Sequence, residues 1–290
     1  MVSVMEAARQ VLREAFRLYA RNWRALLMAA GLLLLPVTAI KAAAPRLAAW
    51  NTIPAGLRAG ALASAGSWVL TIVQHLVVIL TTNALVFLLA RQLMGQPIDW
   101  RTSWRLGLGR ARPAITAQLA VLLPMMGFAA ILVLPAIGVG MIYAARHVDQ
   151  PVWVSQALPI MLGAGVIFLC VRFAFVDLVA VIEQKSSFAA YGRNLDLLKG
   201  CFWRLAAVLA PIEIGRQLLI VAVRLLPLSD ALSSAASNLV TWLVLPLETA
   251  ATLWLYSRIR AEREGYDADQ LGADLAPTPA PPPAAFTPPI

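Results

Sequence analysis

Six long apolar stretches fill this chain almost from end to end, and they limit its possible folds more than any other feature. A helix needs about 20 mostly apolar residues to cross the roughly 30 Å hydrocarbon core of a bilayer. The stretches reach that length at residues 24–44, 65–90, 114–143, 155–181, 205–227 and 236–257. The sequence therefore predicts an all-α, polytopic membrane protein with a six-helix transmembrane bundle.

The composition supports a membrane location and argues against a soluble fold. Hydrophobic residues make up 60% of the chain and charged residues 13%, and the mean hydropathy is +0.74. Soluble domains are nearer half apolar and about a quarter charged. The net charge of +9 comes from Lys and Arg that lie mostly between the spans, so we expect no nucleic-acid partner.

The positions of Lys and Arg predict the orientation of the spans. The N-terminus, loops 91–112 and 183–204 and the C-terminus together hold seventeen of these residues, and the loops on the other side hold five. Basic residues in short loops favour the cytoplasmic side. We therefore expect a multi-pass protein of the bacterial inner membrane with both termini in the cytoplasm.

Two amphipathic segments are predicted at the cytoplasmic face. In segment 4–22, Arg9, Arg13, Arg17 and Arg21 recur every four residues, opposite an apolar stripe that includes Ala8, Val11 and Ala15. This pattern is typical of a helix lying over anionic lipid headgroups. It serves either as an anchor leading into the first span or as a lipid-sensing or partner-binding helix. Segment 183–202 has the same character and predicts a second interfacial helix before the fifth span.

The C-terminal residues differ sharply from the rest of the chain. Seven prolines fall within residues 276–289, a density that opposes helix and favours extended polyproline. We therefore divide the chain into an integral membrane domain, 1–267, and a disordered, Pro-rich cytoplasmic tail, 268–290.

Ionisable residues at membrane depth are the candidate functional site, because such residues are rare and are either paired or functional. They are His75, Arg172, Asp177, Glu213, Arg216 and Glu248. Glu213 and Arg216 are three residues apart and can pair on one helix face. Glu248 lies near the middle of the last span, where an unpaired carboxylate costs several kcal/mol, so Arg172 or Arg216 is its expected partner. Structural ion pairing and a proton-coupled or substrate-binding site both remain open.

The second span carries polar residues at helical spacing. Thr71, Gln74, His75, Thr81 and Thr82 are predicted to face protein or water, because lipid offers them no hydrogen bonds. His75 is either a candidate proton relay or a side chain hydrogen-bonded within the bundle.

Recognisable catalytic and cofactor motifs are absent from the sequence. With only His75 and His147, the chain cannot contain the HExxH motif of zinc peptidases, and it contains no GxSxG nucleophile elbow. Gly107-Leu108-Gly109 is interpreted as a simple loop beside Arg110. Cys170 and Cys201 lie in or beside spans and predict neither a disulfide nor a metal site. We expect no enzymatic activity, no cofactor and no metal.

The second half of the chain has a pattern of its own. An apolar run leads from Arg172 to Glu183, followed by Tyr191-Gly192-Arg193, and the last span ends in Leu255-Tyr256-Ser257-Arg258 before Gly265-Tyr266. Over residues 170–267 this pattern resembles the glycerophosphoryl diester phosphodiesterase membrane domain and related six-span bacterial membrane proteins. The first half resembles them only in layout.

The resemblance implies a membrane fold more than an activity. Family members often show Tyr-x-Asp-x-Arg at the end of the last span, whereas Ser257 and Ile259 flank Arg258 here. Some members carry a separate phosphodiesterase domain, which these residues do not contain, so hydrolase activity is not implied.

Three functions are consistent with the sequence. The first is a non-enzymatic membrane protein with an organisational or transport-like role. The second is a small-solute or lipid transporter that uses the intramembrane charges, and the third is a regulatory or partner-binding module. The expected partners are membrane lipids, anionic at the cytoplasmic face, and a protein partner of unspecified identity.

Overall fold

The computed structural model describes residues 4–50, 57–97, 99–145, 161, 163–165 and 167–276. Every regular element in these residues is an α-helix. The helices are α1 (Val4–Trp50), α2 (Leu57–Leu93), α3 (Trp100–Gly109), α4 (Ala111–Ala145), α6 (Val176–Ile182), α7 (Ser187–Leu198), α8 (Phe202–Arg224), α9 (Asp230–Glu264) and α10 (Ala268–Leu275).

Six of the described segments are long and apolar enough to cross a membrane. They are Ala8–Ile40, Val69–Leu93, Ala111–Phe128, Gly163–Ile182, Phe202–Arg224 and Leu232–Glu264. Each overlaps one of the six predicted spans, so the prediction of an all-α, multi-pass membrane protein is confirmed.

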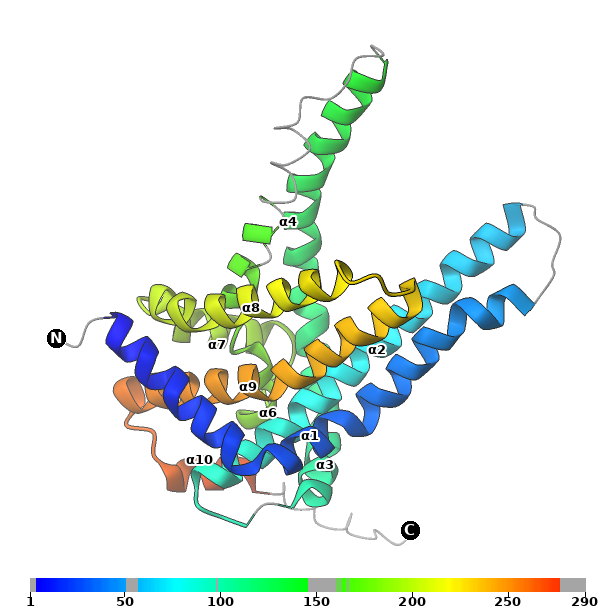
Figure 1. The fold of residues 1–290 in the computed structure, drawn as a ribbon. Coiled ribbons are helices and arrows are strands. Elements are labelled where there is room, and N and C mark those ends of the chain that lie inside the picture. Colours follow the sequence, from blue (N-terminus) through cyan, green and yellow to red (C-terminus); the bar gives the residue numbers. More distant parts are fainter. Residues whose placement is uncertain are drawn as a thin grey trace, which may run out of the picture.

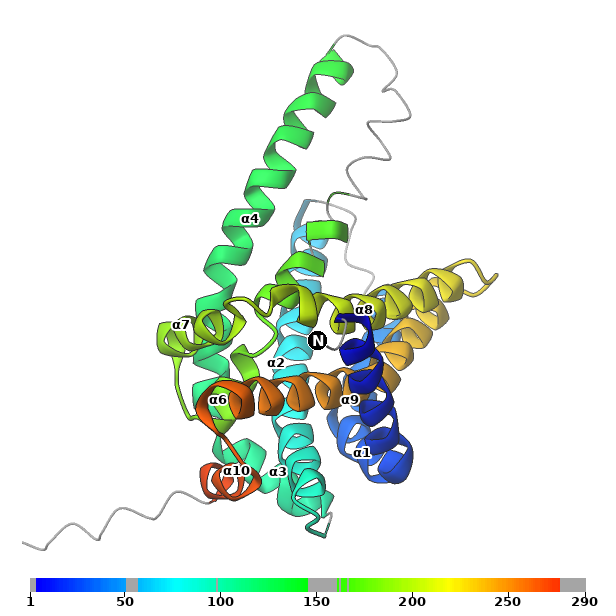
Figure 2. The same ribbon diagram turned by 90° about the vertical axis from the view of Figure 1, so that its left-hand side faces the viewer.

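The long segments form three pairs that diverge from a common base. The pairs are α1 with α2, α4 with the segment that leads into α6, and α8 with α9 (Figure 1). Phe128 of α4 stacks on Phe168, with ring centroids 6.2 Å apart, within the second pair. Figures 1 and 2 show α4 projecting away from the other helices, while α3, α6 and α10 lie together at the opposite end. We call this end the base.

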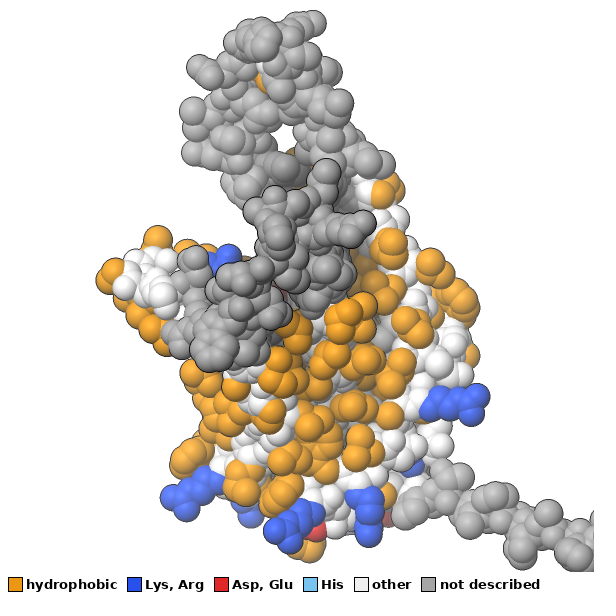
Figure 3. All heavy atoms as spheres, turned by 90° about the vertical axis from the view of Figure 1, so that its right-hand side faces the viewer, with side chains coloured by type: hydrophobic (Ala, Val, Ile, Leu, Met, Phe, Trp, Pro, Cys, Tyr) orange, Lys and Arg blue, Asp and Glu red, His pale blue; other side chains and the backbone are white. Residues whose placement is uncertain are grey.

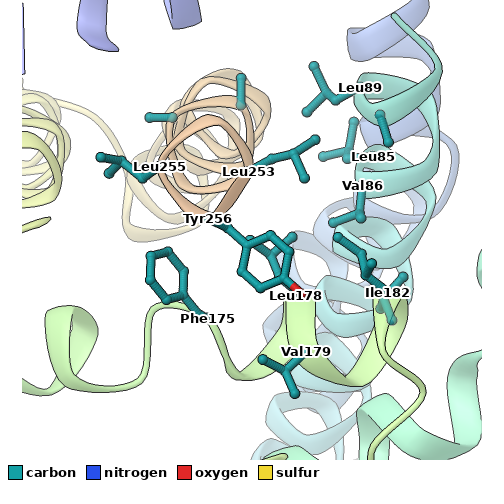
Figure 4. Packing of buried hydrophobic residues seen from close by; sticks show 14 of the residues in the cluster. Leu85, Val86, Leu89, Phe175, Leu178, Val179, Ile182, Leu253, Leu255 and Tyr256 are labelled. Carbon is teal, nitrogen blue, oxygen red and sulfur yellow. The ribbon is translucent and has the colours of Figure 1, made fainter. Parts of the chain in front are cut away.

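The buried core lies where the three pairs meet. Leu85, Val86 and Leu89 of α2 face Phe175, Leu178 and Ile182 around α6, and Tyr256 of α9 lies between them (Figure 4). The Tyr256 side chain is fully buried and meets Phe175 edge-on at 5.7 Å. Above the base, a broad hydrophobic band covers one face of the molecule (Figure 3), as lipid contact requires.

The first helix is bent at Asn22, whose backbone leaves the helical region at φ −135° and ψ 27°. The carbonyl of Leu18, one turn earlier, accepts a hydrogen bond from Gln92 of α2 (3.1 Å). The bend separates the predicted surface helix from the first span. The N-terminal part crosses α9 (Figure 1), with Arg258 of α9 3.4 Å from Gln10.

The apolar stripe of this N-terminal part is covered by protein. Ala8, Val11 and Ala15 are buried in the common core, and the arginines at positions 9, 13, 17 and 21 are exposed. The amphipathic helix is therefore present. Its apolar face packs against the bundle, whereas the sequence predicted that the helix would lie over lipid headgroups. The arginine face is what remains available to headgroups.

The fourth span is interrupted, whereas the sequence predicted one continuous helix over 155–181, part of which lies outside the described residues. Residues 173–175 form a turn between the helical residues 167–172 and α6. Asn194 of α7 is fully buried at this break. Its side chain accepts a hydrogen bond from the Phe175 N–H (3.0 Å) and donates one to the Arg172 carbonyl (2.9 Å). Backbone groups freed inside a membrane need such partners.

Residues 100–109 form helix α3, so the interpretation of Gly107-Leu108-Gly109 as a loop is wrong. Asp99 caps the helix and accepts a hydrogen bond from the Arg101 N–H (3.0 Å). Gly107 lies directly on α2, where an added Cβ would sit 2.9 Å from the Ala84 nitrogen. The absence of a side chain at Gly107 allows the backbones of α3 and α2 to approach each other. The spacing of Gly107 and Gly109 in the sequence did not predict this contact.

The predicted boundary of the C-terminal tail is also wrong. Ala268–Leu275 forms α10, which starts with a capping box between Asp267 and Gln270 and buries Leu271 and Leu275. Arg110 fixes its end by donating to the Ala276 carbonyl (2.9 Å). The Pro-rich residues 277–290 lie outside the described residues.

Candidate functional site: a polar cavity where the helix pairs meet

A polar cavity of about 200 Å³ lies between the three helix pairs. Its charged lining residues are Asp177 of α6, Arg216 of α8 and Glu248 of α9, and Thr82 of α2 and Thr252 of α9 add hydroxyl groups. Each helix pair therefore contributes at least one polar side chain. Side chains that are distant in sequence meet here at membrane depth, where water is scarce and polar groups need partners.

Asp177 is held in place by the second helix pair. Its Oδ1 accepts a hydrogen bond from Gln118 Nε2 of α4 at 2.6 Å. His75 of α2 is near enough to act electrostatically on this carboxyl group, although the imidazole itself is exposed. Asp177 lies in the first turn of α6, directly after the break, and its side chain lines the cavity.

Glu213 and Arg216 form the ion pair that their spacing predicts. Arg216 Nη2 lies 2.5 Å from Glu213 Oε2, and the Glu213 side chain is only 5% exposed. The other carboxylate oxygen of Glu213 accepts a hydrogen bond from Gln217 (2.7 Å). Arg216 therefore has a carboxylate partner on its own helix, and its Nε has no hydrogen-bond partner among the described residues.

Glu248 faces the cavity one turn from Thr252, whose hydroxyl donates to the Glu248 carbonyl (2.7 Å). The charges that act on its carboxyl group are Arg216, Glu213 and Asp177. No ion pair joins Glu248 to Arg172 or Arg216 within the described part of the chain, so the expected direct partner is missing there.

The cavity and its border hold more negative than positive groups. Among the described residues, Asp177, Glu213 and Glu248 face the single guanidinium of Arg216. Several kcal/mol oppose each uncompensated charge in such surroundings. The surplus carboxylates therefore suit a proton or another small cation, whereas an anion would meet repulsion.

The structure places the remaining predicted site residues elsewhere. Arg172 lies at the break in the fourth span, where its carbonyl contacts Asn194, and its side chain does not line the cavity. In the second span, Gln74 donates to Asn238 of α9 (3.2 Å), Thr81 is buried, and Thr71 and His75 are exposed. The predicted polar stripe is thus only partly turned inward.

A second charged cluster at the base was not predicted as a unit. It consists of Glu183, Lys185, Arg193, Tyr256, Arg260, Glu264, Tyr266 and Asp274, and we call it the base network. Glu183 sits at its centre, accepting hydrogen bonds from Tyr256 (2.8 Å) and Arg193 (3.0 Å). The sequence offered one signal, since several of these residues belong to the pattern that carries the family resemblance.

Ion pairs extend the base network across four segments. Arg193 also lies 2.5 Å from Glu264, and Arg260 lies 2.9 Å from the same carboxylate. The Arg260 guanidinium stacks 3.5 Å from the ring centre of Tyr266, whose hydroxyl donates to Asp274 (2.8 Å). These contacts attach α10 and α7 to the end of α9.

The electrostatics of the base network favour the charged form of Glu183 and the neutral form of Tyr266. Burial alone would raise the pKa of Glu183, but the hydrogen bonds from Tyr256, Lys185 and Arg193 outweigh it, so the pKa lies below its usual range. Burial and the bond to Asp274 raise the pKa of Tyr266. Both groups are therefore held in one protonation state near neutral pH, which suits a structural junction.

Comparison with known proteins adds no relative. No protein-family model matches the chain, and neither the curated proteins nor the solved structures contain a match. The resemblance to the phosphodiesterase membrane domain stays a prediction.

Proposed function

We propose that this multi-pass membrane protein is a non-enzymatic, transport-like protein that binds a small monovalent cation, the proton included, in its polar cavity. One observation carries the proposal: three carboxylates meet one guanidinium where three helix pairs converge. Proteins keep such unbalanced charges at membrane depth at a cost in free energy, which a bound cation would offset.

The architecture around the cavity supports movement of a bound ion. The cavity walls belong to helix pairs that diverge away from the base (Figures 1 and 2), so a small change in their tilt would alter access to Asp177 and Glu248. The helix broken at 173–175 supplies Asp177. Discontinuous helices supply ion-binding groups in many secondary transporters.

We further propose that the base faces the cytoplasm of a bacterial inner membrane. Most Lys and Arg side chains visible in Figure 3 lie at the base, below the hydrophobic band. This arrangement agrees with the positive-inside rule. The N-terminal part of α1, before the bend at Asn22, and α10 would then lie on the cytoplasmic side.

Binding is tested by thermal unfolding of the purified protein in detergent with chloride salts of sodium, potassium, guanidinium and methylammonium. A ligand that binds only the folded state at 100 times its Kd adds about 2.7 kcal/mol of stability. We expect at least one cation to raise Tm in the unaltered protein. Glu248→Gln and Asp177→Asn should abolish that shift, and the exposed Glu262→Gln should retain it.

Movement is tested in liposomes containing a trapped pH dye or cation dye, with a potassium diffusion potential as the driving force. Flux in the unaltered protein should exceed that of Glu248→Gln and of protein-free liposomes. Equal flux in all three samples, together with no cation-dependent Tm shift, would contradict the proposal and favour an organisational role.

A further inference from the structure

An apolar groove of about 540 Å³ lies along α1, and none of its lining residues lines the polar cavity. It runs along one face of α1 from Arg24 to Leu35, and Trp100 of α3 and Trp242 of α9 complete its walls. Met28, Leu32 and Leu35 expose between 42 and 54% of their surface here. The groove is open on the side that a membrane protein turns toward lipid.

The groove is shaped by fixed side chains. The Trp242 indole donates a hydrogen bond to the Leu27 carbonyl (3.1 Å), which holds the ring against α1. Gly31 lies under this ring, and a Cβ at that position would come within 3.1 Å of it. The missing side chain at Gly31 and the anchored Trp242 therefore keep the groove formed without an occupant.

One end of the groove is positively charged. The Arg24 guanidinium lies 5.4 Å from the ring centre of Trp23, and no acidic residue is among the described residues that line the groove. Arg24 also has no ion pair within the described part of the chain. Trp23 and Trp100 beside it are residues typical of the membrane interface, so this end is suited to a negatively charged headgroup.

The length of the groove matches one leaflet of a bilayer. Arg24 and Leu35 are eleven residues apart on a helix, which corresponds to roughly 16 Å at 1.5 Å per residue. The hydrocarbon core is about 30 Å thick, so each leaflet contributes about half. A groove with a basic end at the interface and an apolar end near the bilayer centre has the dimensions and polarity of one lipid acyl chain.

We propose that this groove binds one anionic glycerophospholipid, with an acyl chain along α1 and the phosphate at Arg24. Basic pockets between transmembrane helices are recognised sites for anionic headgroups. The proposal is independent of the cation site, since no residue lines both the groove and the polar cavity.

The test is photo-crosslinking of the full-length protein in phosphatidylcholine vesicles. Each sample contains a small fraction of either phosphatidylglycerol or phosphatidylcholine with the same diazirine-bearing acyl chain. After tryptic digestion, mass spectrometry measures labelling of the fragment 25–41, which becomes 22–41 in a variant that lacks the cleavage site at Arg24. We expect the anionic probe to label this fragment several-fold more than the neutral probe.

Four variants separate headgroup recognition from acyl-chain contact. Arg24→Gln should reduce anionic labelling to the neutral level, and Arg24→Lys, which keeps the charge, should preserve most of the preference. Leu32→Trp should fill the groove and reduce labelling by both probes. Leu123→Trp, at a 63% exposed position on α4 outside the groove, should change neither.

Equal labelling by the two probes in the unaltered protein would overturn the proposal, as would a preference that survives Arg24→Gln. A crosslinked dimer through residues 25–41, in place of lipid labelling, would also overturn it, because the groove would then hold a second copy of the chain. Circular dichroism of every variant in detergent verifies that the helices are retained.

Discussion

The base network and the polar cavity both gather charged side chains, but only the base network balances them. In the base network, Glu183, Glu264 and Asp274 oppose Lys185, Arg193 and Arg260, and each ion pair spans 2.5–3.9 Å. Among the described residues at the cavity, Asp177, Glu213 and Glu248 oppose the single guanidinium of Arg216, and the exposed His75 acts on Asp177 from outside the lining.

This difference separates a structural role from a functional one. Balanced groups satisfy one another, so their removal should cost stability and leave binding unaffected. Groups in surplus repel one another when ionised, so the removal of one should cost little stability and abolish binding. Single substitutions in the two clusters should therefore differ in their effect on stability.

The largest effect is expected from Glu183→Ala. The substitution leaves Tyr256, Lys185 and Arg193 without their shared acceptor, and removing one partner of a buried pair costs about 3–5 kcal/mol. Thermal unfolding in detergent should show a large fall in Tm. The exposed Glu262→Ala, which breaks surface pairs with Arg204 and Arg258, should cost less than about 1 kcal/mol.

The same substitution predicts a pH dependence with a defined sign. The folded pKa of Glu183 lies below the ordinary value of 4.5. Its stabilisation is therefore complete above pH 4.5 and is lost as the pH falls through the folded pKa. The Tm difference between the unaltered protein and Glu183→Ala should shrink in acid. A constant difference down to pH 3 would contradict the central role assigned to this carboxylate.

Asn194→Ala should have the next largest effect, because Asn194 connects the base to the cavity through the broken span. The buried Phe175 N–H loses its acceptor, at about 1–3 kcal/mol, and the part-buried Arg172 carbonyl loses its donor. Hydrogen–deuterium exchange should accelerate at residues 173–176. Asp196→Asn, an exposed change on the same helix, is the control, and unchanged exchange in Asn194→Ala would contradict the assignment.

The smallest stability effect is expected from Glu248→Gln. Arg216 keeps Glu213 as its partner, so the substitution strands no cation, and it removes one of three crowded carboxylates. We expect Tm without added cation to stay the same or rise slightly. A fall as large as that of Glu183→Ala would show that Glu248 is a structural group and would remove the contrast between the two clusters.

The sequence predicts local features of the candidate site well and its assembly poorly. The Glu213–Arg216 pair follows from helical spacing within one element. The sequence did not correctly predict a direct partner for Glu248, because such a pair depends on which helices become neighbours. Asn194 gave no signal, since an asparagine in an amphipathic segment resembles any surface residue until the break it satisfies is known.

The sequence by itself determined the membrane class, the six spans and the basic face of the first helix, because these depend on hydrophobicity and helical period along a single segment. Only the tertiary structure decided the break at 173–175, the docking of α10 and the balance of the two charge clusters. Those features arise where backbones and side chains from distant segments meet. The energy of each such contact depends on which side chain or backbone group packs against it. The order of residues along the chain does not specify that group.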